Sequence, residues 1–204
     1  MTLQRLVLVR HGETDFNATG RMQGHLDSHL TQTGLAQARA AVPAVTAFHP
    51  NVLLSSDLRR ATDTAVMFAE ATGLTLRIDK RLRETRLGEW QGLGLAEVEA
   101  GWPGDLNIWQ NDPEWTPPGG EARVEVAARA AEVVAELDVE CDGTAVLCAH
   151  GGLIASLTAR LLSLPVANWP LLGGMSNCHW TVLARRPDGD GRWRLRAYNT
   201  GVIG

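Results

Sequence analysis

Two short apolar runs, each followed at once by polar residues, constrain the fold more than any other feature of the sequence. Residues 6–9 read Leu-Val-Leu-Val, and residues 145–148 read Ala-Val-Leu-Cys. Continuous runs of this kind are typical of strands buried on both faces, because a strand with one face in water alternates apolar and polar residues. Such strands occur mainly in parallel sheets that helices cover on both sides. The sequence therefore predicts a layered α/β fold.

Segments with helical periodicity alternate with these runs along the chain. Thr31 can cap a helix over residues 32–48, within which Pro43 predicts a kink or an early end. Further helices are expected over residues 57–72 (closed by Gly73), 121–137 and 153–164, and further strands over residues 52–54, 74–78, 179–184 and 193–198, the last two joined by a turn at Asp188-Gly189. This alternation predicts a three-layer α/β/α sandwich with a mostly parallel central sheet.

Length and charge narrow the class of protein. With 204 residues, 45% of them hydrophobic, the chain is expected to form a single domain over residues 1–204. Its net charge of −4 comes from acidic and basic residues mixed along the chain, without a Lys/Arg block that would follow a nucleic-acid backbone. No apolar stretch approaches the length of a membrane span. We expect neither nucleic acid nor a membrane as partner, and the oligomeric state is left open.

The cysteines indicate a reducing compartment. Cys141, Cys148 and Cys178 are odd in number and form no Cys-x-x-Cys pair, which argues against a disulfide framework and against a thiolate zinc site. The first apolar run is too short for a signal peptide, and no small-residue cleavage site follows it. A cytoplasmic location is therefore expected.

The stretch from about residue 88 to residue 120 lacks a clear period. It contains several Pro and Gly residues together with Trp90, Trp102, Trp109 and Trp115. Long irregular segments in compact domains often serve as lids over a binding site. We expect residues of about 93–120 to form a lid-like segment, whose tryptophans could line a hydrophobic substrate pocket.

Both apolar runs lead into a His-Gly pair, His11-Gly12 after the first and His150-Gly151 after the second. Ligands of open α/β sheets bind at the carboxyl ends of the strands, which is where both histidines would lie. Glycine lets the backbone approach a ligand closely, and its N–H group can donate to an anion. A single histidine in such a place is more often structural, whereas two in matching contexts indicate a functional site.

Arginines lie at the same strand ends. Arg10 precedes His11, while Arg59 and Arg60 fall in the first turn of the helix expected over residues 57–72, where the helix macrodipole disfavours cations. A residue that breaks a local rule often belongs to a functional site, so we expect one of this pair to face the ligand. The planar guanidinium can donate two parallel hydrogen bonds to a phosphate, which favours a phosphorylated ligand.

A series of motifs runs along the chain: residues 8–17 (Leu-Val-Arg-His-Gly-Glu-Thr-Asp-Phe-Asn), 20–24 (Gly-Arg-Met-Gln-Gly), 56–61 (Ser-Asp-Leu-Arg-Arg-Ala), 82–84 (Leu-Arg-Glu), 88–92 (Gly-Glu-Trp-Gln-Gly), 119–121 (Gly-Gly-Glu) and 149–151 (Ala-His-Gly). In this order they resemble the motifs of the histidine phosphatase superfamily, in its phosphoglycerate mutase-like branch. The resemblance extends from residue 6 to about residue 160. An isolated Arg-His-Gly would be a weak match, whereas the ordered set is specific.

The resemblance implies a role for each matching residue. His11 would carry the phosphoryl group, Arg10, Arg60 and His150 would bind its oxygens, and Glu84 would be the proton donor. The wider phosphate-binding set that the resemblance implies is Arg10, Asn17, Gln23, Gly24, Arg60, His150 and Gly151. No metal and no cofactor would be required, because two arginines and a protonated His150 could balance the phosphoryl charge.

Three of these residues have simpler explanations that stay open at this point. Asn17 and Gln23 could be ordinary loop-capping residues. Glu84 could be a surface carboxylate paired with one of the arginines around it, Arg81, Arg83 or Arg86.

Two other functional classes fit these residues less well. A metal hydrolase could use His11, His150 and Glu84 as ligands, but two nearby guanidiniums would repel a divalent cation. A non-catalytic phospho-ligand-binding protein would not need both a nucleophile and a proton donor. Within the family, residues 16–24 resemble the phosphatases more than the cofactor-dependent phosphoglycerate mutases, and Lys and Arg are absent between residues 87 and 121. We expect hydrolysis of a phosphomonoester of a small metabolite through a phosphohistidine, with the substrate left open.

Overall fold

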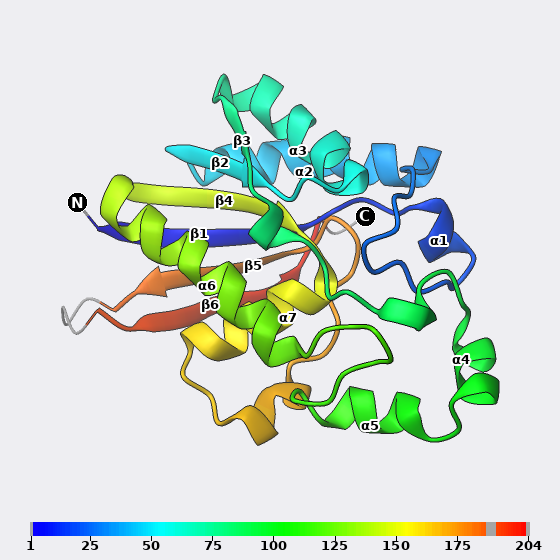
Figure 1. The fold of residues 1–204 in the computed structure, drawn as a ribbon. Helices are drawn as coiled ribbons and strands as arrows, with labels where there is room; N and C mark the ends of the chain where they lie inside the picture. The colour runs from blue at the N-terminus through cyan, green and yellow to red at the C-terminus, as the bar shows by residue number, and fades with distance from the viewer. Residues whose placement is uncertain (1, 187–190, 203–204) are drawn as a thin grey trace.

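The computed structural model describes residues 2–186 and 191–202, and its centre is a mixed sheet with the strand order β3-β2-β4-β1-β5-β6 (Figure 1). The strands are β1 (Leu3–Arg10), β2 (Val52–Ser55), β3 (Leu76–Ile78), β4 (Gly143–Ala149), β5 (Trp180–Arg185) and β6 (Trp193–Thr200). The first four in the order pair in parallel, whereas β5 is antiparallel to β1 and β6 is antiparallel to β5. The expected α/β class with a mostly parallel sheet is confirmed.

Helices cover both faces of this sheet (Figure 1). The α-helices are α1 (Asp15–Ala18), α2 (Gln32–Ala47), α3 (Arg59–Thr72), α4 (Leu95–Gly101), α5 (Asp105–Asn111), α6 (Arg123–Glu140) and α7 (Gly151–Leu161), and the 3₁₀ helices are η1 (Lys80–Leu82), η2 (Gly88–Trp90) and η3 (Val166–Leu171). Of these, α2 and α3 pack on one face and α6 and α7 on the other. Among the described residues, no helix combines the length and apolar character that a membrane crossing needs.

The first strand shows why its apolar run is continuous. Leu6 and Leu8 contribute to the core beneath α6 and α7, whereas Val7 and Val9 contribute to the core beneath α2 and α3. All four side chains are fully buried. Because successive side chains of a strand point to opposite faces, a strand covered on both faces needs apolar residues at every position.

The expected bounds are correct to within three residues for the predicted strands and helices. The early end at Pro43 is wrong, because α2 continues through it to Ala47. Pro43 lies on the exposed side of the helix, where water can satisfy the carbonyl that lacks its partner. The predicted turn at Asp188-Gly189 lies outside the described residues.

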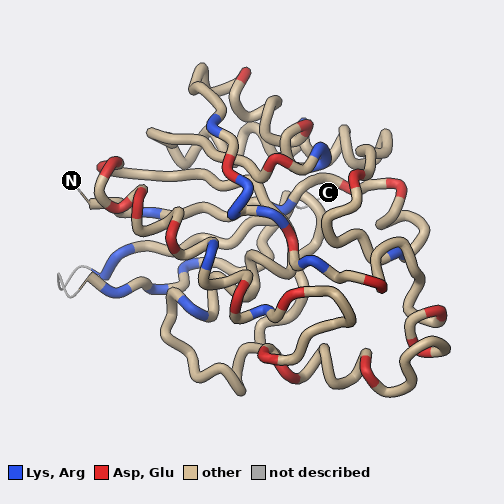
Figure 2. The backbone as a smooth tube through the Cα atoms, in the orientation of Figure 1, with Lys and Arg blue, Asp and Glu red and all other residues tan. Residues whose placement is uncertain are grey.

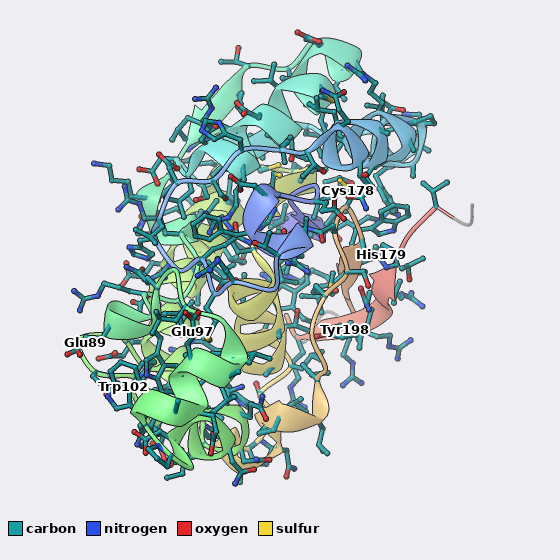
Figure 3. The ribbon with its side chains drawn as sticks, turned by 90° about the vertical axis from the view of Figure 1, so that its right-hand side faces the viewer. Glu89, Glu97, Trp102, Cys178, His179 and Tyr198 are labelled. Carbon is teal, nitrogen blue, oxygen red and sulfur yellow. The ribbon has the colours of Figure 1, made fainter. Side chains whose placement is uncertain are left out.

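The segment expected to be irregular contains two short helices, α4 and α5, so that part of the prediction is wrong. Trp90 is fully buried and packs against the rings of Trp102, Trp109 and Trp115, with centroid distances of 6.3, 6.0 and 5.5 Å. Figure 3 shows Trp102 on this segment, near Glu97. Helices of seven residues are too short to show a clear period in the sequence, and here the shared tryptophan cluster stabilises them.

The hairpin of β5 and β6 carries a group of arginines. Figure 2 shows them as blue segments along the hairpin, on which Arg194 and Arg196 are exposed. Part of this charge is paired, since Arg185 lies 2.6 Å from Asp138 and stacks over the Trp193 ring at 4.0 Å. Exposed charges on an edge strand oppose pairing with a further strand, which is a structural use for them.

Candidate active site

The carboxyl ends of three neighbouring strands position the site. β1 and β4 pair in parallel with Arg10 opposite Ala149, so His11 and His150 leave the two strands at the same level. Their ring centroids are 5.2 Å apart, and both side chains are buried. β2 lies on the other side of β4 and leads into α3, which carries Arg60.

His11 is held as a neutral ring with a defined tautomer. Its Nδ1 lies 2.7 Å from the carbonyl oxygen of Gly12, which can only accept, so Nδ1 carries the hydrogen. The other nitrogen, Nε2, accepts a hydrogen bond from Arg60 Nε at 3.2 Å and therefore keeps a lone pair. Burial, and then the charges of Arg60 and Arg10, lower the pKa of His11 well below 6.5. A neutral ring with its lone pair at Nε2 is the form that a nucleophile requires.

His150 has the opposite tautomer. Its Nδ1 accepts from the same Arg60 Nε at 3.2 Å, so the hydrogen is on Nε2. That Nε2 is buried and has no hydrogen-bond partner in the described chain. Burial, and then the charge of Arg60, lower the pKa of His150 well below 6.5. In this arrangement the ring is neutral and presents a free N–H donor, and a protonated His150 beside a bound phosphoryl group stays a prediction.

Arg60 joins the two histidines. It is 1% exposed, and its Nη1 and Nη2 donate to the carbonyl oxygens of Leu26 at 2.9 Å and Gly24 at 2.8 Å. These bonds hold the guanidinium so that Nε faces both rings. Burial lowers the pKa of Arg60 to about 10, which still leaves it charged at neutral pH. Arg59, its neighbour in sequence, is exposed and pairs with Asp63 at 3.4 Å.

Arg10 adds a second buried guanidinium. Its Nη1 donates to the carbonyl oxygen of Met175, and its Nε is buried without a hydrogen-bond partner in the part of the chain described. Burial lowers the pKa of Arg10 below its ordinary value. Two confined arginines and two unpartnered donors, Arg10 Nε and His150 Nε2, form a site suited to a doubly charged oxyanion.

Glu84 lies at the start of α7 and not on the surface among its neighbouring arginines. Its Oε2 accepts from the backbone N–H of Gly152 at 2.9 Å, and its Oε1 accepts from that of Leu153 at 3.0 Å. A Cβ atom at position 152 would lie 2.7 Å from Oε1, so glycine there allows the approach. Arg81 and Arg83 pair with other carboxylates. Glu84 is thereby oriented at the same cavity as His11.

Asn17 and Gln23 make the local hydrogen bonds that their simpler explanation predicts. The Asn17 Oδ1 accepts from the backbone N–H of Thr14 at 3.2 Å and closes the capping box of α1, and the Gln23 Oε1 accepts from Ser28 Oγ at 2.7 Å. Both residues also line the cavity. Within the described residues each amide uses its oxygen for local structure, which leaves its NH₂ group to donate to a ligand.

Gly12 serves a different purpose from the one expected. The N–H of Gly12 donates to Thr64 Oγ1 at 3.1 Å, and a Cβ atom on Gly12 would lie 2.5 Å from the carbonyl oxygen of Gly34. Gly12 is thus needed for the close packing of α2, and the expectation that its N–H faces an anion is wrong. Gly24 supports Arg60 through its carbonyl oxygen and also lines the cavity, as does Gly151.

Asn177 is a supporting residue that sequence reasoning missed. It lies next to Cys178, which Figure 3 labels on the segment that leads into β5. Its Nδ2 donates to the backbone oxygen of His11 at 3.1 Å and to Asn17 Oδ1 at 3.2 Å. No motif quoted from the sequence extends beyond residue 151, so nothing marked Asn177 in advance.

These residues open on one cavity of about 360 Å³. Its lining also includes Arg21, Trp109, Arg123, Trp169 and Leu172, none of which was predicted individually as a phosphate-binding residue. Of the tryptophans in the middle segment, Trp109 lines the cavity, whereas Trp102 and Trp115 pack on Trp90. Among the described residues, no group of three His, Cys, Asp or Glu side chains is placed to hold a metal ion.

Comparisons with known proteins agree with this geometry. The model of the histidine phosphatase superfamily (branch 1) matches residues 6–201. A Mycobacterium tuberculosis protein named glucosyl-3-phosphoglycerate phosphatase is 51% identical over 213 aligned residues, which cover 98% of this chain and 96% of that one. The solved structure of a mycobacterial glucosyl-3-phosphoglycerate phosphatase with VO3 has a TM-score of 0.92 and 51% identity, covering 97% of this chain and 100% of that one. A probable phosphoglycerate mutase of Salmonella paratyphi C is 35% identical and aligns with 79% of this chain and 76% of its own.

A buried histidine pair flanked by two arginines, at the carboxyl edge of a parallel sheet, defines a phosphoryl-transfer site. The chain belongs to the histidine phosphatase superfamily, branch 1. Within that family it is a phosphomonoester hydrolase.

Proposed function

We propose that this chain hydrolyses glucosyl-3-phosphoglycerate and that the phosphoryl group passes through His11 without a metal ion. The observation that carries the mechanism is the shared donor, Arg60 Nε, which leaves a lone pair on His11 Nε2 and an N–H on His150 Nε2. The substrate is supported by the 51% identity, over 98% of the chain, to a relative of that name.

In the first half-reaction, His11 Nε2 attacks phosphorus in line with the ester oxygen that leaves. Arg10 Nε and His150 Nε2 are the buried donors left for the equatorial oxygens, and the charges of Arg10 and Arg60 balance those of the phosphoryl group. Glu84 in its acid form gives a proton to the leaving alkoxide. In the second half-reaction its carboxylate removes a proton from the attacking water, and the P–N bond breaks to restore the lone pair on His11.

The single domain, the lid and the compartment belong to the same proposal. Residues 1–204 would act as one domain in which residues 93–120 cover the cavity, supported by the position of Trp109 in its wall. The backbone N–H of Met22 donates to the carbonyl oxygen of Leu93 at 2.9 Å, which ties the start of this segment to the loop after β1. The reducing cytoplasm is supported by the three cysteines, which are free thiols.

We expect phosphate release from glucosyl-3-phosphoglycerate to exceed release from sugar phosphates and nucleoside monophosphates, and we expect 3-phosphoglycerate to be hydrolysed and not isomerised. A mutase must also hold the second phosphate of a bisphosphate. Beyond the histidines the cavity offers Arg21, which is already paired with Glu97 at 3.4 Å, and Arg123. Arg123, which forms no ion pair with a described carboxylate, can bind the carboxylate of a substrate. A single guanidinium is a poor match for the second phosphate dianion of a bisphosphate.

The measurement follows free phosphate and 2-phosphoglycerate together, after 3-phosphoglycerate is mixed with catalytic 2,3-bisphosphoglycerate. A parallel screen of phosphorylated metabolites ranks the substrates by kcat/KM. Isomerisation that far exceeds phosphate release would replace the phosphatase with a mutase, and a low rank for glucosyl-3-phosphoglycerate would reject that substrate.

We further expect turnover to survive dialysis against EDTA, because Arg10 and Arg60 already supply the positive charge that a metal ion would bring. The control is the same protein with magnesium, manganese or zinc added back after dialysis. Activity lost on dialysis and restored by one of these ions would favour the metal hydrolase.

A further inference from the structure

Two side chains in the cavity wall, Trp109 and Arg123, fix each other. Trp109 belongs to α5, and Arg123 is the first residue of α6. Arg123 Nη2 donates to the carbonyl oxygens of Trp109 at 2.6 Å and Gln110 at 3.1 Å. Its guanidinium carbon lies 5.7 Å from the centre of the indole ring, within the range of a cation–π contact. The two side chains therefore form a preorganised unit.

This unit presents two buried donors that have no partner. Arg123 Nε and Trp109 Nε1 are both buried, and neither has a hydrogen-bond acceptor among the residues that the structure describes. Buried N–H groups are nearly always satisfied, because an unmade hydrogen bond costs roughly 1–3 kcal/mol. Both residues line the cavity that contains His11, so a bound ligand can supply the acceptor.

The charge of Arg123 specifies which kind of acceptor fits. Its hydrogen bonds go to neutral carbonyl groups, and no described carboxylate forms an ion pair with it. Arg21, the other arginine on this side of the cavity, is more exposed and already pairs with Glu97. Arg123 thus brings a positive charge to a partly buried site beside a neutral indole donor, and Asp112 acts on that charge without forming an ion pair. A planar carboxylate matches that charge and accepts two donors at once.

We propose that Arg123 and Trp109 form a carboxylate subsite that binds the glycerate carboxylate of the substrate while its phosphate lies at His11. This inference rests on the proposed function, since it names the group by which a phosphoglycerate ester is distinguished from other phosphomonoesters. Neither residue takes part in phosphoryl transfer. Together they select the substrate.

The matched substrates 3-phosphoglycerate and glycerol 3-phosphate test the subsite, because they differ in having a carboxylate or a hydroxymethyl group at the same carbon. Arg123→Gln should lower kcat/KM for 3-phosphoglycerate by about 10- to 100-fold, the usual effect of a hydrogen bond to a charged group, with little change for glycerol 3-phosphate. Trp109→Phe, which removes the N–H and keeps an aromatic ring, should cause a smaller loss with the same selectivity. Arg59→Gln is the control and should leave the ratio of the two substrates within about threefold, because Arg59 is exposed, paired with Asp63 and outside the cavity lining.

An equal loss on both substrates would overturn the subsite in favour of a structural role for Arg123. No loss on either substrate would also overturn the subsite, and so would an equal loss of selectivity in the control variant Arg59→Gln. If the wild-type protein released no phosphate even from 4-nitrophenyl phosphate, the proposed function would fail separately. Calorimetric titration of the protein with 3-phosphoglycerate and with glycerol 3-phosphate would then test the subsite. The wild-type protein should bind 3-phosphoglycerate more tightly, and Arg123→Gln should lose that difference in affinity.

Discussion

Replacing His11 with alanine is expected to lower phosphate release by roughly 10⁴-fold or more, the scale on which loss of a nucleophile acts in enzymes that form a covalent intermediate. The reason is that His11 Nε2 keeps its lone pair. The carbonyl oxygen of Gly12 holds the ring hydrogen on Nδ1, and burial keeps the ring unprotonated. His150 cannot replace it, because its Nε2 carries a hydrogen.

The measurement is rapid acid-free quenching of a reaction with ³²P-labelled substrate, followed by digestion and identification of the labelled peptide. A phosphohistidine is labile to acid and stable to base, so the label should show both properties and lie on the peptide that contains His11. The Arg59→Gln variant serves as the control, because Arg59 is exposed and outside the cavity lining. Label on another residue, or turnover retained in His11→Ala, would reject His11 as the carrier.

Replacing Glu84 with glutamine is expected to slow release from alkyl phosphates by about 10²- to 10⁴-fold, the range assigned to a positioned general acid or base. The loss of nitrophenol from 4-nitrophenyl phosphate should be affected much less, because nitrophenolate leaves without a proton. Water must still be activated against the phosphohistidine, so the second half-reaction should slow for every substrate.

The variant should therefore show a pre-steady-state burst of nitrophenol followed by slow turnover. This readout separates catalysis from structure, since Glu84 also accepts hydrogen bonds from the first turn of α7 and glutamine cannot accept all of them. Thermal unfolding of the variant measures the structural part. Equal slowing of all leaving groups without a burst would contradict the role of Glu84 as proton donor and base.

The sequence alone determined the layered architecture and the approximate place of the chemistry. Leu6 to Val9 had to form a doubly covered strand, because each of these side chains is apolar and needs a buried environment. The residue that follows such a strand lies at the carboxyl edge of the sheet. This places His11 after β1 and His150 after β4 at the same edge. The preference for Arg60 over Arg59 came from the family motif, and the structure places Arg60 between the histidines.

Local pattern could not identify the short helices of the middle segment. Their stability depends on packing around Trp90, which contacts Trp102, Trp109 and Trp115 from different turns of the chain. Likewise α2 tolerates Pro43 because that residue faces solvent, and the sequence did not show which side of the helix would be exposed.

Only the tertiary structure decided how the functional groups act. Arg60 Nε lies within 3.2 Å of both histidines and so sets their opposite tautomers, although His150 is 90 positions away in sequence. Glu84 meets the N-terminus of α7 across 68 positions, and Arg123 meets Trp109 across 14. The chemical types of these residues were visible in the sequence, but their hydrogen-bond partners were not. These partners depend on how whole elements pack against one another, and the arrangement of the sheet and its covering helices determines that packing.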